Sequence, residues 1–548
     1  MKLFRKTSLA IMLCLAGAGT LAARAEEPKA SASGPAPSAA PIGRVSVASF
    51  NELKKLIADL GIPIPLDPRA MIEGNFPFIG PGGLQGDKPI GLVFIGGEKI
   101  TTQDGAVLMF PVAEGKAGVE SFAKMGGVVT DGHADMVSLG NVKFRRTANY
   151  LMMYQGATDL LAAIKDDIFA KDYTRPGRLA LLSLDLAAAR KVAPTKLKAM
   201  FEESRPKKSP TSAAEAAGEK MGIEFFESCA NKFDRFSLAI GRDEKNVHME
   251  LWLMPVELAE ARRFPCPTFP ADVVAQMHIA YPNAEAANWA STLMAKIPDD
   301  AVADKKPGAA ANPKIRAAMT RFVQLFTGAD AQSMAVQITA RKPVLYLVNQ
   351  YGHDVDAAKE MQEIATELNA ANKDSGDGDV MAFTSYKNAA GQAISRLTQL
   401  VKGKQLTTID VVQHGRILTF SIADDDGQHV DAVAALPAKG EISKLCTGSI
   451  DLDACLSAAE SSGQMPPLPP EKMKQLHTSL AGQAITWSAK ANAEAKYLYV
   501  DVGTPFVLFT EAGQMAMMNM MMPPPATRGG GAGPAPSDGG ITAPGKGP

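Results

Sequence analysis

The densest group of acidic side chains in this sequence is "FSIADDDGQHV", residues 420–430. An EF-hand calcium loop alternates its acidic ligands with other residues and ends on a glutamate. Here Asp424, Asp425 and Asp426 are consecutive, so their side chains point in different directions, and no glutamate stands at the required position. We expect a strand-to-helix junction in which one aspartate caps a helix that begins near Gln428. Calcium binding is the less favoured alternative.

A methionine cluster near the C-terminus, "GQMAMMNMMMPPP", is the second candidate site. It contains Met515, Met517, Met518, Met520, Met521 and Met522. Thioethers are soft ligands that suit Cu(I), so a copper site is one interpretation. Methionine also forms adaptable apolar surfaces, and we favour packing against the folded body or against a partner.

Four cysteines follow the N-terminal segment: Cys229, Cys266, Cys446 and Cys455. In an exported protein, an even number is compatible with two disulfides. A Cys229–Cys266 bridge would close a hairpin, and a Cys446–Cys455 bridge would tie a strand to the following helix. Four buried thiols are the alternative. The spacings match no zinc site, because the chain has neither a Cys-x-x-Cys motif nor paired histidines.

The chain lacks the common catalytic motifs. It has no Gly-x-Ser-x-Gly nucleophile elbow, and its glycine-rich stretches lack the lysine and serine that end a phosphate-binding loop. Its seven histidines are scattered along the sequence. We assign no catalytic residue and no cofactor, and we favour a non-catalytic protein over an enzyme.

The N-terminus has the pattern of a secretory signal. Lys2, Arg5 and Lys6 precede a short apolar stretch, and Ala23-Arg24-Ala25 is a small-x-small cleavage site. We therefore expect residues 1–25 to be removed during export to the periplasm or the medium. No later segment has the 18 or so consecutive apolar residues that a spanning helix needs, so we expect no transmembrane segment in the mature chain.

Composition narrows the class of partner. The chain carries 57 basic and 58 acidic residues, a net charge of −1, and shows no basic stripe. Nucleic acid is therefore not an expected partner. Two segments have low complexity, a linker at 26–43 and a Pro/Gly-rich tail at 523–548, with the methionine-rich segment 512–522 before the tail.

Between these segments, one local pattern recurs: a short strand, a polar loop and an amphipathic helix. In a first half, residues 44–262, it occurs at 44–60, 106–125, 150–164 and 178–200. In a second half, residues 265–511, it occurs at 272–294, 342–368, 416–436 and 442–460. A hairpin closes each half, at 233–254 and at 483–502.

These patterns predict an α+β fold of two tandem, structurally similar halves. Each half is expected to be a mixed or largely antiparallel sheet with helices packed on one face. The segment "LQGDKPIGLVFIG", followed by the strand–helix units and the final hairpin, resembles exported bacterial proteins of unknown function built from duplicated α+β units. That resemblance covers most of residues 44–511. It implies export and architecture, and it brings no catalytic residues.

The sequence thus predicts an exported, non-catalytic envelope protein that binds or scaffolds an unknown ligand or envelope protein. One alternative is a hydrolase or other enzyme whose site lies in the cleft between the halves. Another is a copper- or calcium-binding envelope protein.

Overall fold

The computed structural model describes residues 39–509 apart from several internal segments. These are 60–66, 77, 99–104, 171, 174–176, 196–232, 255–262, 282–316, 319–320, 323, 326–327, 340–341, 376–379, 402, 426, 435, 437, 464–467 and 493–495. None of the helices in the described ranges is both long enough and apolar enough to cross a bilayer.

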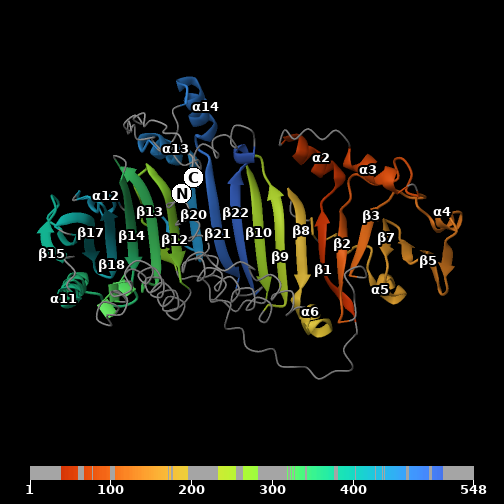
Figure 1. Cartoon of the computed structure of the whole chain (residues 1–548), viewed down its shortest axis with the longest axis horizontal. Helices are drawn as coiled ribbons and strands as arrows, with labels where there is room; N and C mark the ends of the chain where they lie inside the picture. Colours follow the sequence, from red (N-terminus) through yellow and green to blue (C-terminus); the bar gives the residue numbers. More distant parts are fainter. Residues whose placement is uncertain are drawn as a thin grey trace, which may run out of the picture.

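The described residues form one antiparallel sheet of 20 strands (Figure 1). Its strands are β1 (Ala40–Val47), β2 (Ile90–Gly96), β3 (Ala106–Pro111), β4 (Val128–Thr130), β5 (His133–Leu139), β6 (Val142–Arg146), β7 (Tyr150–Tyr154), β8 (Arg178–Asp185), β9 (Arg235–Arg242), β10 (Asn246–Met254), β12 (Val273–Ala280), β13 (Ala331–Thr339), β14 (Lys342–Gln350), β15 (Val380–Lys387), β16 (Ala393–Val401), β17 (Lys404–His414), β18 (Ile417–Ala423), β20 (Cys446–Asp451), β21 (Ala484–Asn492) and β22 (Tyr497–Pro505). A separate two-stranded sheet joins β11 (Phe264–Pro265) and β19 (Glu441–Ile442).

The helices connect these strands. They are α2 (Phe50–Asp59), α3 (Pro68–Asn75), α4 (Val119–Ala123), α5 (Thr158–Ala163), α6 (Leu186–Val192), α11 (Ala357–Ser375), α12 (Asp431–Ala434), α13 (Leu452–Ser461), α14 (Pro470–Leu480) and the 3-10 helix η2 (Phe506–Phe509). The predicted strand–helix units and both hairpins are confirmed wherever the structure describes their elements. In the unit at 272–294, only the strand, β12, is described.

The strands follow a definite order across the sheet. From one edge to the middle, the order is β4-β5-β6-β7-β3-β2-β1-β8-β9-β10. From the other edge to the middle, it is β15-β16-β17-β18-β14-β13-β12-β20-β21-β22. The two series meet where β10 pairs with β22.

Capping side chains start several helices immediately after a strand. Ser49 Oγ accepts a hydrogen bond from the backbone N–H of Glu52 at 3.1 Å, at the start of α2. Asp185 and Asp451 each accept from the backbone N–H three residues later, at 2.8 Å and 2.9 Å, and so cap α6 and α13. Each cap satisfies an N–H group that has no partner within its helix, which lets a strand turn directly into a helix.

Helices cover both faces of the outer parts of the sheet, so the prediction of helices on one face is wrong. Near one edge, Phe110 packs with Phe122 of α4, whereas the preceding residue, Met109, packs with Leu161 of α5. Adjacent strand residues point to opposite faces, so the two helices lie on opposite sides. The reason is that these strands are apolar at consecutive positions and need cover on both sides.

The other edge is covered in the same way. Leu347 packs with Met361 of α11 on one face, and Tyr346 packs with Val433 of α12 on the other. The middle strands differ, because only one of their faces is apolar. Leu251 and Leu253 of β10 belong to the core that joins β10, β20, β21 and β22.

One boundary differs from the sequence prediction. Strand β1 begins at Ala40, within the segment expected to be a linker, and pairs with β2 from that residue onward. Its register shifts between Pro41 and Gly43, an irregularity that accommodates a proline near the strand end.

Two residues on the same face of β10 test how far the buried core extends along the strand. Leu253 is 1% exposed and Met249 on the same strand is 49% exposed. Leu253→Ala should lower the free energy of unfolding by about 2–5 kcal/mol, because it leaves a cavity in the core. The control Met249→Ala should change it by about 0.5 kcal/mol or less. Urea denaturation followed by circular dichroism measures both, and equal effects would contradict the placement of Leu253 inside the core and of Met249 outside it.

Candidate functional site

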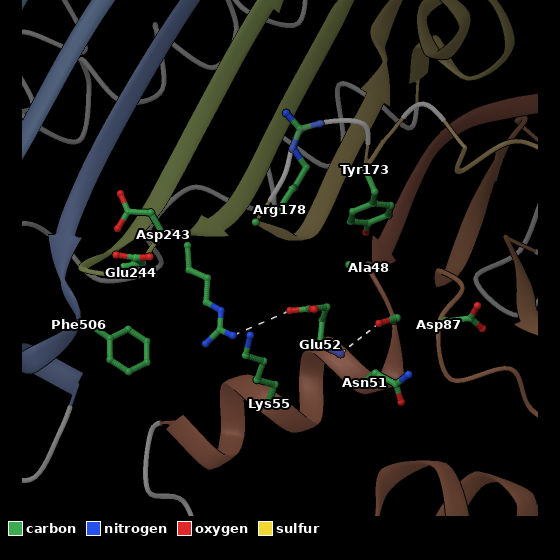
Figure 2. Close-up of a pocket in the computed structure, with 13 residues that line it drawn as sticks. Ala48, Asn51, Glu52, Lys55, Asp87, Tyr173, Arg178, Asp243, Glu244 and Phe506 are labelled. Carbon is green, nitrogen blue, oxygen red and sulfur yellow. Dashed lines mark hydrogen bonds and ion pairs between the residues drawn. The ribbon is translucent and has the colours of Figure 1, made fainter.

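An open cleft of about 1150 Å³ lies where α2, the start of β8, the β9–β10 turn and η2 meet (Figure 2). Clefts of this size accommodate small molecules. The lining residues are Ala48, Ser49, Asn51, Glu52, Lys55, Asp87, Tyr173, Gly177, Arg178, Arg242, Asp243, Glu244 and Phe506.

The first wall of the cleft is the N-terminal turn of α2. Ser49 is buried and its hydroxyl is occupied as the helix cap. The backbone N–H of Asn51 donates to the carbonyl oxygen of Gly86 at 3.0 Å, which ties the helix to the segment before β2. A Cβ atom on Gly86 would lie 2.7 Å from Asn51 Oδ1, so a larger residue there would displace the Asn51 side chain. The helix therefore holds Glu52 toward the cleft on a fixed backbone.

The second wall is the segment that enters β8. Gly177 has φ +79°, and its carbonyl oxygen accepts from the backbone N–H of Arg242 at 2.8 Å. This bond joins the start of β8 to the end of β9. Nearby, the Tyr173 hydroxyl donates to Ser46 Oγ at 2.8 Å. Burial raises the pKa of Tyr173, so its phenol stays neutral and serves as a hydrogen-bonding wall.

A buried ion pair supports these walls from behind. Arg178 Nη1 donates to the carbonyl oxygen of Asp172 at 2.5 Å, and Nη2 lies 3.4 Å from Glu250 Oε2. The guanidinium also stacks over the Trp252 ring, 4.8 Å from its centroid. Glu250 is 3% exposed and accepts from the Tyr499 hydroxyl at 3.0 Å. In Figure 2 the Arg178 guanidinium points away from Glu52 and Lys55. The guanidinium therefore holds the wall in place, and other side chains would contact a ligand in the cleft.

The third wall is the turn between β9 and β10, which Asp243 organises. Asp243 Oδ1 accepts from the backbone N–H groups of Lys245 and Asn246, both at 2.7 Å. His248 lies between two carboxylates, with Nε2 3.0 Å from Asp243 Oδ2 and Nδ1 3.1 Å from Asp501 Oδ1.

Burial and hydrogen bonding act in opposite directions on the pKa values of this turn. Burial alone would raise the pKa of Asp243, but its hydrogen bonds to His248 and the two N–H groups lower it to about 2. Burial alone would lower the pKa of His248, but its hydrogen bonds to Asp243 and Asp501 outweigh burial and raise it. Asp243 is thus an ionised structural group at neutral pH.

Charged side chains of both signs meet across the cleft. Arg242 Nη2 lies 4.0 Å from Glu52 Oε2, an ion pair between the end of β9 and α2. Lys55, Asp87 and Glu244 are exposed at the cleft. Such a site suits a polar ligand that carries both donor and acceptor groups. The hydroxyl of Ser49 is used as a cap and the phenol of Tyr173 is neutral, so neither is an activated nucleophile.

The structure describes part of the acidic stretch. Asp425 Oδ1 accepts from the backbone N–H of Gly427 at 3.0 Å and lies 2.7 Å from His429 Nε2. These contacts close a turn, and α12 begins only at Asp431, so the helix predicted to start near Gln428 begins three residues later. Asp424 precedes this turn, and Asp426 lies outside the described residues. No group of three or more His, Cys, Asp or Glu side chains in the described part of the chain is arranged to hold a metal ion.

Three of the four candidate cysteines are described, and all three are free: Cys266, Cys446 and Cys455. The structure therefore lacks the Cys446–Cys455 bridge. Burial, with a smaller effect of Asp451, raises the pKa of Cys455 to about 12, so it is an unreactive thiol. Cys229 and the methionine cluster at 515–522 lie outside the described residues.

The sheet also places Cys266 beside His278, a pair that is not evident in the sequence. The Cys266 sulfur lies 3.8 Å from both ring nitrogens, so it is aligned with neither of them. His278 Nδ1 bonds instead to Ser333 Oγ at 2.8 Å. Burial raises the pKa of Cys266 and lowers that of His278. The pair is therefore a neutral thiol and a neutral imidazole, unlike an activated cysteine nucleophile.

The residues that build the cleft belong to no functional motif in the sequence. One signal was present in "VHMELWLM", where Glu250 interrupts an otherwise apolar strand. A carboxylate in such a strand needs a buried partner. The sequence does not identify that partner, Arg178, because it is 72 residues away.

The pH dependence of stability tests the His248 contacts. Because its pKa is raised on folding, the stabilisation is fully present below the unfolded-state pKa, about 6.5, and is lost as pH rises through the folded-state pKa. His248→Gln should therefore destabilise the protein more at about pH 5.5 than at about pH 9. The charge of Asp243 is constant over this range. Thermal unfolding at both pH values measures the difference, and an equal loss at both would refute the ion-pair assignment.

Comparisons with protein-family models, with curated protein sequences and with solved structures find no match for this chain.

Proposed function

We propose that this chain is an exported, non-catalytic binding protein of the cell envelope, built from two tandem α+β halves. Its ligand site is the cleft between α2, the β9–β10 turn and η2. The observation that carries this proposal is the composition of the cleft: charges of both signs converge there from separate segments, while the Ser49 hydroxyl is occupied as a helix cap and the Tyr173 phenol is neutral.

The order of the strands supports the duplication. The series from β4 to β10 and the series from β15 to β22 connect their members in the same chain order. The hairpins β9–β10 and β21–β22 occupy the same place in the two series, and they meet in the middle. In a duplicated chain, such a junction joins two equivalent edge strands.

The location of the cleft also favours binding. Twelve of its thirteen lining residues come from the first half, and Phe506 comes from the element that follows β22 of the second half. The cleft therefore borders the junction at which a ligand would contact both halves. Sites between domains or repeats are a common location for ligands.

Replacing two exposed charges of the cleft tests the proposal. Lys55→Ala combined with Glu244→Ala removes one charge of each sign from its walls. The mature wild-type protein, purified from its own host, should carry a small polar ligand in native mass spectrometry, and the double variant should lose it. Lys54→Ala is the matched control, because Lys54 pairs with Asp67 and does not line the cleft. An empty wild-type protein, or a double variant that retains its ligand, would exclude this binding site.

Export has its own test. The mature protein should begin at Glu26, after removal of residues 1–25, because signal peptidase requires small residues at the cleavage site. Ala23→Leu together with Ala25→Leu should block processing and leave the precursor. Intact mass measurement of the exported fraction distinguishes the two forms. A full-length chain that starts at Met1 in the wild type would contradict the proposal of a cleaved signal.

A further inference from the structure

A second cavity, of about 780 Å³, lies beside the loop between β3 and α4 and the turn between β6 and β7. It is separate from the cleft described above and shares no lining residue with it. The residues that line it include Gln85, Lys88, Glu114, Lys116, Glu120 and Arg146.

Arg146, the last residue of β6, holds this loop and keeps one unused donor. Its Nε donates to the carbonyl oxygen of Lys116 at 3.1 Å, and Nη2 donates to that of Ala113 at 3.0 Å. Both acceptors are neutral. The remaining nitrogen, Nη1, is buried and has no hydrogen-bond partner among the described residues. A buried, unpaired donor on a charged group is costly, so a partner is expected there.

The corresponding hairpin at the other end of the sheet has no such donor. Arg146 of β6 pairs with Leu151 of β7, and Gln413 of β17 pairs with Leu418 of β18. As Arg146 of β6 ties down the loop that follows β3, Gln413 of β17 ties down the loop that follows β14, with Nε2 donating to the carbonyl oxygen of Val355 at 2.6 Å.

The two side chains differ in the donors and acceptors that remain free after this contact with the loop. Gln413 Nε2 also donates to the carbonyl oxygen of Gly415 at 3.1 Å, and its Oε1 accepts from the backbone N–H of Ala357 at 3.1 Å. Both polar atoms of the Gln413 side chain are therefore hydrogen-bonded within the protein. A neutral glutamine is sufficient to hold the loop, so the positive charge and extra donor of Arg146 serve another purpose.

An unused acceptor lines the same cavity. Gln85 Oε1 is buried and also lacks a hydrogen-bond partner among the described residues. Its backbone N–H donates to the carbonyl oxygen of Pro111 at 2.9 Å, which places Gln85 beside the loop that Arg146 holds. A ligand that satisfies both groups must accept a hydrogen bond from a guanidinium and donate one to an amide oxygen.

The remaining lining gives the cavity its charge and shape. Lys88 donates to Asn149 Oδ1, and Lys116 is exposed. The loop is held in an uncommon conformation, because Ala117 has φ +50° although it is not glycine and is buried. Residues in this region cost free energy and often occur at binding sites. Two exposed acids, Glu114 and Glu120, also line the cavity and can accept hydrogen bonds from donor groups of a ligand.

We infer that this cavity binds a carboxylate that bears hydroxyl groups next to it, such as a sugar acid, with the carboxylate on Arg146 and a hydroxyl on Gln85. Charge-assisted bonds from a guanidinium to a carboxylate are among the strongest in proteins. Two acids, Asp166 and Glu114, act electrostatically on Arg146. Asp166 is engaged by Thr147 and Asn149, and Glu114 is exposed and makes no hydrogen bond to Nη1. The inference extends the proposed binding function to a second site and does not depend on the first cleft.

Isothermal titration of the mature chain with three probes tests this inference. Gluconate carries the carboxylate and the hydroxyls, hexanoate carries only the carboxylate, and sorbitol carries only the hydroxyls. The wild-type protein should bind gluconate more tightly than either of the others by roughly tenfold or more. Equal binding of all three probes, or no binding of gluconate at millimolar concentration, would overturn it.

Two variants assign the contacts. Arg146→Gln installs the residue of the second hairpin and should weaken gluconate binding by roughly tenfold or more. Gln85→Leu should retain hexanoate binding and abolish the preference for gluconate over hexanoate. It provides the test if the Arg146 variant fails to fold.

Two controls complete the design. Lys124→Gln makes the same change of charge at an exposed residue outside the cavity and should leave binding unchanged. The Lys55 and Glu244 double variant should also leave it unchanged, so failure at one site is distinguishable from failure at the other. Undiminished gluconate binding by Arg146→Gln, or an unchanged preference in Gln85→Leu, would refute the assigned contacts.

Discussion

The pairing of β10 with β22 is the interaction on which the rest of the structure depends. It runs over eight positions, from Asn246 opposite Pro505 to Leu253 opposite Leu498, and it turns two ten-stranded series into one sheet. On one face it aligns Leu251 and Val500 within the central core. On the other face it brings the Glu250 carboxylate to the Tyr499 hydroxyl. Without this pairing, each series would expose a long edge strand, which is a site of aggregation.

The polar contacts at this junction constrain the sheet more than they stabilise it. Glu250 is almost fully buried, and removing a charge from water is costly unless its partners are well placed. Those partners come from three strands: Arg178 of β8, Tyr499 of β22 and, through Arg178, the ring of Trp252. Any slip of register would leave the carboxylate unpaired. The ion pair thus fixes the alignment of β8, β10 and β22, and this alignment positions both the turn at Asp243 and the start of β8 beside α2.

The hairpins β6–β7 and β17–β18 illustrate how similar local structures acquire different chemistry. At one hairpin, Gln413 holds a loop with every polar atom of its side chain engaged. At the other, Arg146 makes the same loop contact and retains a charged donor. The hydrogen bond to a loop carbonyl is the structural requirement at both hairpins. The type of side chain that makes this bond determines which donors remain for a ligand. The acidic turn at Asp425 follows the same logic, since its carboxylate is used to close a turn next to His429.

Local sequence patterns predict the strand–helix units, the two hairpins and the antiparallel, α+β character of the fold, because hydrophobic periodicity and capping residues act over a few positions. They did not predict β4, β5, β6, β13, β16 and β17, each of which is followed by another strand and so falls outside the strand–loop–helix pattern. The predicted arrangement of helices was wrong, although the consecutive apolar residues of β3 and β14 are typical of strands covered on both faces. The sites depend on contacts between distant residues. Glu52 and Arg242 are 190 positions apart, and Arg178 and Glu250 are 72 apart, so no local pattern pairs them. Their proximity follows from the pairing of strands across the sheet, which long-range burial selects.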